Sequence, residues 1–83
     1  MKFNDRMQDI QVARNDNGDH MGWIGKMGDG YTWVVPDGRM SIDPHTGDGN
    51  FTSREEAHYM LVGMYERPEI YGFNREDWAP VWA

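Results

Sequence analysis

The chain has 83 residues, 14 acidic and 8 basic side chains, a net charge of -6 and no cysteine. A domain this small must be stabilised by packing or by a partner, because it has neither disulfides nor cysteine-ligated zinc. The basic residues are spread singly along the chain, which disfavours direct binding to nucleic acid or to a membrane surface. The apolar runs are too short to span a bilayer or to form a signal peptide. We therefore expect one small cytoplasmic domain over 1–83.

The first predicted hairpin joins strands over 9–14 and 20–27. Residues 9–14 alternate polar and apolar side chains, as a half-buried strand does. Asn17 and the glycine after it favour a two-residue turn, since both central residues of a type I′ turn have positive φ. This turn places Val12 opposite Trp23.

The next two turns predict strands over 31–36 and 39–43. The segment Gly28–Gly30 fits a loop of two or of three residues, and the two alternatives direct opposite faces of the strand toward the core. We favour the three-residue loop because it places Met27 opposite Tyr31 and gathers the large apolar side chains on one face. A Pro-Asp-Gly turn closes the third hairpin.

In this register one face of the sheet should lie under a helix. Its apolar members are Ile10, Val12, Met21, Trp23, Met27, Tyr31, Trp33, Val35, Met40 and Ile42. The other face carries Ile24 paired with Val34. Either the C-terminal segment folds across this pair, with Trp78 or Trp82 covering it, or the pair is a contact surface for a partner. We favour the first interpretation, because the C-terminal aromatic side chains otherwise have nowhere to be buried.

A helix is predicted over 53–66. Thr52 or Ser53 can cap its start, with Glu55 or Glu56 completing a capping box. Apolar residues at helical spacing give the helix one side that can cover the sheet. This stripe consists of Ala57, Met60, Leu61, Met64 and Tyr65. The proline at 68 ends the helix.

The C-terminal segment 68–83 carries too many aromatic and apolar side chains to remain in water. The predicted fold class is therefore α+β. It consists of a four-stranded antiparallel β-meander, one α-helix packed on one face, and an aromatic-rich C-terminal extension.

The sequence contains no recognisable constellation for catalysis. Ser41 and Ser53 lack a nucleophile motif and an evident base, and the glycines follow the hairpins instead of a phosphate-binding pattern. The loop over 43–50 is rich in oxygen-bearing side chains but departs from the EF-hand pattern. The three histidines lack metal-ligand spacing. We expect a protein that is not an enzyme and that has no cofactor or metal site.

The acidic residues have two interpretations. Many of the aspartates fall at predicted turns, where local hydrogen bonding favours them. Together with the glutamates, they would also surround a small body with negative charge. Such a body can dock on a basic protein surface that normally holds DNA or RNA.

The leading functional hypothesis is a non-enzymatic binding protein that occupies a surface of a larger protein. In size, acidity and lack of catalytic motifs the chain resembles the small modulators that bacteriophages encode against host machinery, such as anti-CRISPR and polymerase-inhibiting proteins. Mimicry of nucleic-acid charge is one route by which it would act. The candidate contact residues are Ile24, Val34, Glu55, Glu56, Asp77, Trp78 and Trp82. The alternative is a structural or assembly protein that forms a homo-oligomer through its C-terminal aromatics.

Overall fold

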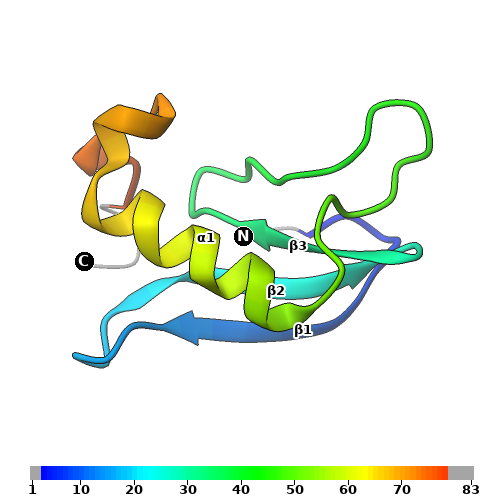
Figure 1. The fold of residues 1–83 in the computed structure, drawn as a ribbon, viewed down its shortest axis with the longest axis horizontal. Coiled ribbons are helices and arrows are strands. Elements are labelled where there is room, and N and C mark those ends of the chain that lie inside the picture. Colours follow the sequence, from blue (N-terminus) through cyan, green and yellow to red (C-terminus); the bar gives the residue numbers. More distant parts are fainter. Residues whose placement is uncertain (1–2, 79–83) are drawn as a thin grey trace.

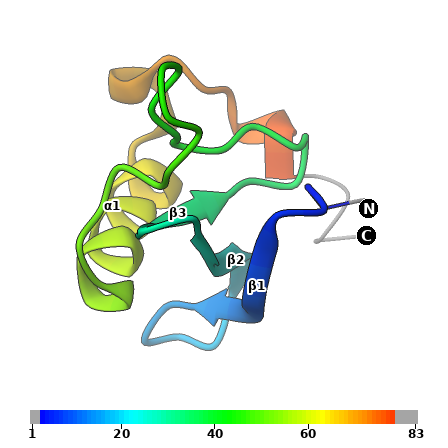
Figure 2. The ribbon, with the colours of Figure 1, turned by 90° about the vertical axis from the view of Figure 1, so that its right-hand side faces the viewer.

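The structure, a computed structural model, describes residues 3–78 (Figure 1). Strands β1 (Met7–Arg14), β2 (His20–Met27) and β3 (Gly30–Val34) form one antiparallel sheet in the order β1-β2-β3. A single α-helix, α1, lies on one side of this sheet, and the N-terminal segment lies on the other (Figure 2). The predicted α+β class is confirmed.

Helix α1 spans Arg54–Glu66, and its N-cap is Ser53, one of the two predicted capping residues. The Ser53 hydroxyl accepts a hydrogen bond from the Glu56 N–H at 3.2 Å. The Glu56 carboxylate in turn accepts hydrogen bonds from the N–H and the hydroxyl of Thr52. These contacts satisfy N–H groups that have no partner within the helix, which is why α1 begins here.

The loop between β2 and β3 has two residues and not the three predicted, because Met27 pairs directly with Gly30. Gly28 has a φ of 61°, which suits the first position of such a loop. The segment around Gly49 lies close to the start of β3, so a Cβ at Gly30 would be 2.0 Å from the carbonyl oxygen of Gly49. A one-residue change of register turns alternate side chains to the opposite face.

The apolar residues therefore divide between the two faces differently from the prediction. The helix-side cluster, beneath α1, contains the buried residues Ala13, Met21, Ile24, Val35, Ala57, Leu61, Met64, Tyr65, Phe73 and Trp78, with Tyr31, Trp33, Phe51, Met60 and Val62 partly buried against it. The far-side cluster, on the opposite face, contains the buried residues Met7, Met27 and Val34, with Phe3, Ile10, Trp23, Met40 and Ile42 partly buried against it. Trp23 and Met27 thus lie on the face opposite to the predicted one, and Ile24 lies under the helix.

The first hairpin has a three-residue loop instead of the predicted two-residue loop, since the Asn15 N–H donates to the Asp19 carbonyl at 3.2 Å. Met21 is then an extra residue in β2, where the register shifts in a β-bulge. The bulge compensates for the longer loop. Val12 consequently faces Trp23, as predicted.

The fourth strand predicted over 39–43 does not form. This segment makes isolated bridges to β3 and to the loop that follows it. Thr32 supplies the physical reason, because its buried hydroxyl accepts a hydrogen bond from the Ser41 N–H at 2.8 Å. A side-chain oxygen thus replaces the backbone carbonyl that a continuous ladder would use.

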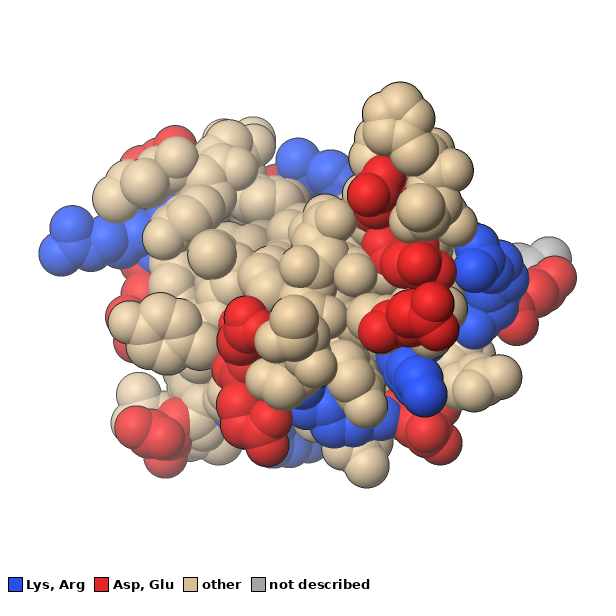
Figure 3. Space-filling view, turned by 45° about the vertical axis from the view of Figure 1, so that its right-hand side comes forward, with Lys and Arg blue, Asp and Glu red and all other residues tan. Residues whose placement is uncertain are grey.

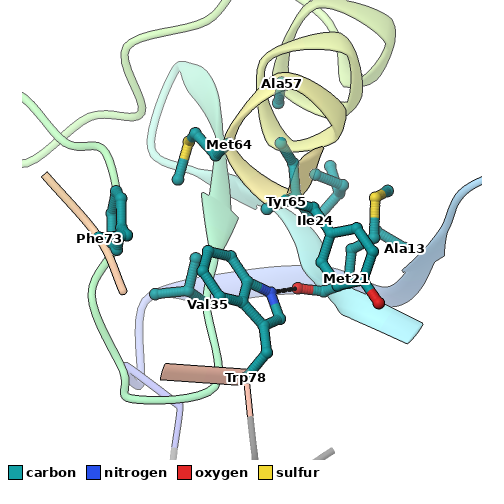
Figure 4. Close-up of a cluster of buried hydrophobic side chains, with 10 residues drawn as sticks. Ala13, Met21, Ile24, Val35, Ala57, Met64, Tyr65, Phe73 and Trp78 are labelled. Atoms are coloured by element: carbon teal, nitrogen blue, oxygen red, sulfur yellow. Dashed lines mark hydrogen bonds between the residues drawn. The ribbon is translucent and has the colours of Figure 1, made fainter. Parts of the chain in front are cut away.

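The C-terminal segment closes one end of the helix-side cluster through the 3₁₀ turns η1 (Pro68–Tyr71) and η2 (Arg75–Trp78). The indole of Trp78 has no exposed surface, and its centroid lies 5.8 Å from that of the Phe73 ring. The Trp78 Nε1–H donates to the carbonyl oxygen of Met21 at 2.6 Å (Figure 4). The C-terminal segment therefore supplies the hydrogen-bond partner of the bulged residue in β2.

Candidate functional site

Three of the predicted contact residues belong to the core. Ile24 and Val34 are buried on opposite faces of the sheet, Ile24 in the helix-side cluster and Val34 in the far-side cluster. Trp78 is buried in the same cluster as Ile24 and not with Val34. These residues do not form a common exposed surface. Trp82, a fourth predicted contact residue, lies outside the described residues.

Asp77, another predicted contact residue, is bound within the chain. The Arg39 guanidinium donates to Asp77 at 2.8 Å and to Asp37 at 2.7 Å, and it lies 4.0 Å from the centroid of the Phe73 ring. These contacts join the turn after β3 to the C-terminal segment. Partial burial raises the pKa of Asp37, but hydrogen bonds from Arg39 and its positive charge lower this pKa more, so the net shift is downward.

The two remaining predicted contact residues, Glu55 and Glu56, are exposed in the first turn of α1. The Glu56 carboxylate accepts hydrogen bonds from the N–H and the hydroxyl of Thr52. Among residues 3–78, Glu55 forms no ion pair. Of the seven predicted residues, this adjacent pair alone is both described and exposed.

A groove of about 520 Å³ separates β1 from α1. It exists because α1 packs on β2 and β3 and leaves the edge strand β1 largely uncovered. Val12, Ala13, Ile24 and Val62 form its aliphatic part. The other residues that line it are Gln11, Arg14, Asp16, Arg54, Glu55, His58 and Tyr59.

Two side chains connect α1 to β1 across this groove. Arg54 donates to the carbonyl oxygen of Asp9 at 2.6 Å and to that of Ile24 at 3.4 Å. Asp9 has a φ of 53° and lies where the register of β1 shifts, so Arg54 supplies a donor to an irregular part of the strand. One helical turn later, the His58 Nε2–H donates to the carbonyl oxygen of Arg14 at 2.8 Å.

The outer face of α1 consists of Glu55, Glu56, Tyr59, Gly63 and Glu66, which lie on the side directed away from the sheet. Met60 lies at the margin of this face, partly buried against the helix-side cluster. Tyr59 is 81% exposed, more than any other large hydrophobic residue in the described part of the chain. It borders the groove and two further hollows, one shared with Phe51 and one shared with Tyr71. A Cβ at Gly63 would lie 3.4 Å from the Tyr71 hydroxyl, which is an ordinary contact distance, so the Tyr71 side chain lies against this part of α1.

Sequence reasoning did not single out Tyr59, although a signal was present. Tyr59 lies outside the apolar stripe of the helix and follows Glu55 and Glu56 at spacings of four and three residues. A large aromatic side chain on the polar side of a helix has no core to fill, and exposed aromatic residues of this kind are enriched in protein interfaces.

The aspartate and glutamate carboxylates differ in how many form hydrogen bonds or ion pairs within the chain. Five aspartates accept hydrogen bonds within the chain or pair with arginine, namely Asp19, Asp37, Asp43, Asp48 and Asp77. Glu66 and Glu69, in contrast, are exposed and form no ion pair within residues 3–78. In the view of Figure 3, acidic residues are interspersed with basic and uncharged ones and do not form one continuous patch.

His20 lies at the end of the first hairpin and does not line the groove. Burial and the positive charge of Arg14 lower its pKa, against the opposing effect of a backbone hydrogen bond. Its ring packs edge-on against Trp23 at 4.8 Å, and its Nδ1 is buried without a hydrogen-bond partner in the structure. The lowered pKa favours the uncharged imidazole of His20, which suits a packing role.

Within residues 3–78, no three His, Asp or Glu side chains lie close enough together to hold a metal ion. No helix of this part of the chain has the length and apolarity that crossing a membrane requires. Comparisons with protein-family models, with curated proteins and with solved structures found no match. Function is therefore inferred from the chain's own surface.

Proposed function

We propose that the chain is a non-enzymatic binding protein that occupies a surface of a larger protein, with the outer face of α1 as its contact surface. The observation that carries this proposal is the position of Tyr59, which is 81% exposed and borders three hollows. Tyrosine is enriched among the residues that dominate binding energy at protein interfaces, because its large ring is buried at little cost in conformational entropy.

The charged residues around Tyr59 support the same proposal. Glu55 lies four residues before it and Glu66 lies seven residues after it, and neither forms an ion pair within the described chain. An aromatic centre with a polar, solvent-accessible rim is the usual anatomy of a protein interface. Charged rim residues mainly set the partner's orientation and its association rate.

A chain of this kind would act as a modulator, blocking or altering the surface on which it docks, as the small phage-encoded modulators do. Mimicry of nucleic-acid charge is a narrower form of this proposal, in which carboxylates stand in for phosphates. The local hydrogen bonds of the aspartates give that form less support than Tyr59 gives to a mixed aromatic and charged contact.

The alternative is self-association through the C-terminal aromatics. Trp78 is buried inside its own chain and donates to Met21, so it is not available to a neighbouring copy. We therefore retain the binding protein as the leading proposal.

The experiment is a pull-down from bacterial lysate with three forms of the full chain: wild type, Tyr59→Ala, and His45→Ala as a matched control. His45 is exposed in the loop after β3 and does not line a hollow described above. Circular dichroism should first confirm that all three forms are folded. We expect a protein retained by wild type and His45→Ala and at least about tenfold less by Tyr59→Ala, as for an interface hot spot. Equal retention by all three forms, or no specific retention, would contradict the proposal.

A further inference from the structure

The two edges of the sheet differ in how they are covered. The outer edge of β3 is occupied by the later chain, since Tyr31 and Phe51 exchange two backbone hydrogen bonds of 2.8 and 3.1 Å. The outer edge of β1 has no such neighbouring segment among the described residues. The groove therefore lies at the edge of the sheet that residues 3–78 leave without a covering segment.

The groove is suited to an apolar group. Its inner surface is formed by Ala13, Ile24 and Val62, and the ring of Tyr59 stands at its margin. Its volume of about 520 Å³ falls within the range of about 300–1,000 Å³ that is usual for ligand pockets. Filling it would remove further apolar surface from water, which is the main favourable contribution to association.

The margin of the groove favours a cationic neighbour for that apolar group. Asp16 and Glu55 line it, and Glu56 and Glu66 lie beyond Tyr59 on the outer face of α1. Only two arginines line the same groove.

Both arginines direct donors toward the backbone of this chain. Arg14 donates to the carbonyl of Gly18 at 2.8 Å, and Arg54 donates to the carbonyls of Asp9 and Ile24. None of the four carboxylates forms an ion pair among the described residues. Glu56 accepts hydrogen bonds from Thr52, so Asp16, Glu55 and Glu66 are the carboxylates that remain available to a basic group. Electrostatic complementarity of this kind selects a partner and raises its association rate.

We infer that the groove between β1 and α1 binds a short segment of the partner protein in which an apolar side chain lies next to a lysine or arginine. The apolar side chain contacts Ile24 and Val62, and the basic group lies near Glu55 or Asp16. This inference rests on the proposed function and specifies the chemistry of the partner.

The test uses a display library of random short peptides selected on the full chain. We expect the enriched peptides to combine a large apolar residue with an adjacent lysine or arginine. Gln11→Trp should fill the groove from β1, because Gln11 is exposed and lines it. Gln8→Trp is the matched control, since Gln8 is exposed on the same strand but does not line the groove. The enriched peptides should bind at least about tenfold more weakly to Gln11→Trp than to Gln8→Trp, as expected when a central contact is blocked.

The charge requirement is tested with the double variant Asp16→Asn, Glu55→Gln. It removes both carboxylates of the groove margin while keeping the size of each side chain. Peptide affinity should fall several-fold, and its decrease with added salt should become shallower than for wild type. An unchanged affinity and salt dependence would contradict the role of these carboxylates.

Other outcomes would overturn the inference without overturning the proposed function. Enrichment of acidic or uncharged peptides, or equal binding to Gln11→Trp and Gln8→Trp, would exclude this partner chemistry at this groove. So would a homodimer that dissociates on Gln11→Trp, because the groove would then hold a second copy of the chain. If no peptide is enriched the inference also fails, while the pull-down with Tyr59→Ala tests the proposed function independently.

Discussion

The apolar clusters on the two faces of the sheet differ in how fully their side chains are buried. The helix-side cluster draws its buried residues from strands, from α1 and from the C-terminal segment, and Trp78 closes it with a hydrogen bond to β2. The far-side cluster has Met7, Met27 and Val34 buried, and its remaining members keep part of their surface in water.

The difference shows how a chain of this size distributes its apolar residues. A domain of about 80 residues buries too little surface to complete two cores. Here regular secondary structure covers one face, and irregular segments with flexible side chains cover the other. Methionine suits the second arrangement, because its unbranched side chain adapts to irregular spaces. We therefore expect substitutions on the helix side to cost more stability than similar substitutions on the far side.

The largest expected effect is that of Trp78→Ala. It removes a fully buried indole and leaves the Met21 carbonyl without its donor, so the free energy of unfolding should fall by about 3–5 kcal/mol. Trp23→Ala is the comparison on the far side, where the indole is partly exposed, and its cost should be smaller. Urea denaturation measures both. A larger loss for Trp23→Ala would reverse the proposed ranking of the two faces.

Truncation to alanine tests the difference between the two faces at two positions that are both almost fully buried. Leu61→Ala, under α1, should lie near the upper end of the range of about 2–5 kcal/mol, because the surrounding helix and sheet cannot collapse into the cavity. Met27→Ala should lie near the lower end, since its partly exposed neighbours can move into the space. Thermal unfolding of the two variants gives the difference, and equal losses would contradict the argument.

The helix cap has the next effect in size. Ser53→Ala removes the oxygen that accepts from the Glu56 N–H, and we expect a loss of about 1 kcal/mol. Ser53→Asp is a suitable control, because aspartate caps helices as well as serine does. The urea midpoint should fall for alanine and be retained for aspartate. If the urea midpoint falls with both substitutions, the Ser53 hydroxyl stabilises the protein by something other than capping α1.

The titration of Asp37 gives the smallest expected effect, at the link between the turn after β3 and the C-terminal segment. Its pKa is lower in the folded protein than its ordinary value of 3.8, so its contribution to stability is present above that value and is lost as the pH falls through the folded-state pKa. Asp37→Asn should therefore lower the Tm slightly at neutral pH, and its difference from wild type should shrink in acid below pH 3.8. A difference that stays constant over this range would indicate a role independent of charge.

The helix could be predicted closely because its signals are local. A capping box, an apolar stripe and a following proline each act within a few residues, and Ala57, Leu61, Met64 and Tyr65 are buried as expected. The side of β3 that carries Tyr31 and Trp33 was also predicted correctly, since both side chains pack with the helix-side cluster.

The register of β2 could not be predicted, because it depends on contacts remote in sequence. The two loop lengths at Gly28 differ by one residue and lead to opposite faces for Ile24. The close approach of Gly49 to Gly30, which accompanies the shorter loop, belongs to a segment about 20 residues further along the chain. The bulge at Met21 likewise depends on the longer first loop and on the donor from Trp78.

The candidate site was predictable only in part. Glu55 and Glu56 were identified from their charge, and the structure leaves both exposed. The groove was not predicted, because it arises from the position of α1 over β2 and β3, which the apolar stripe of the helix does not specify. Tyr59 was detectable as an aromatic residue outside that stripe.

Arg54 and His58 also affect how the chain meets copies of itself. An edge strand such as β1 offers unpaired backbone groups on which the strand of another molecule can assemble, and this is a common route to aggregation. Here the bulge at Asp9 interrupts the regular edge, and donors from α1 already occupy the carbonyls of Asp9 and Arg14. An incoming strand would have to displace both donors before it could extend the sheet. The side chains that connect α1 to β1 thereby oppose the addition of another strand at this edge.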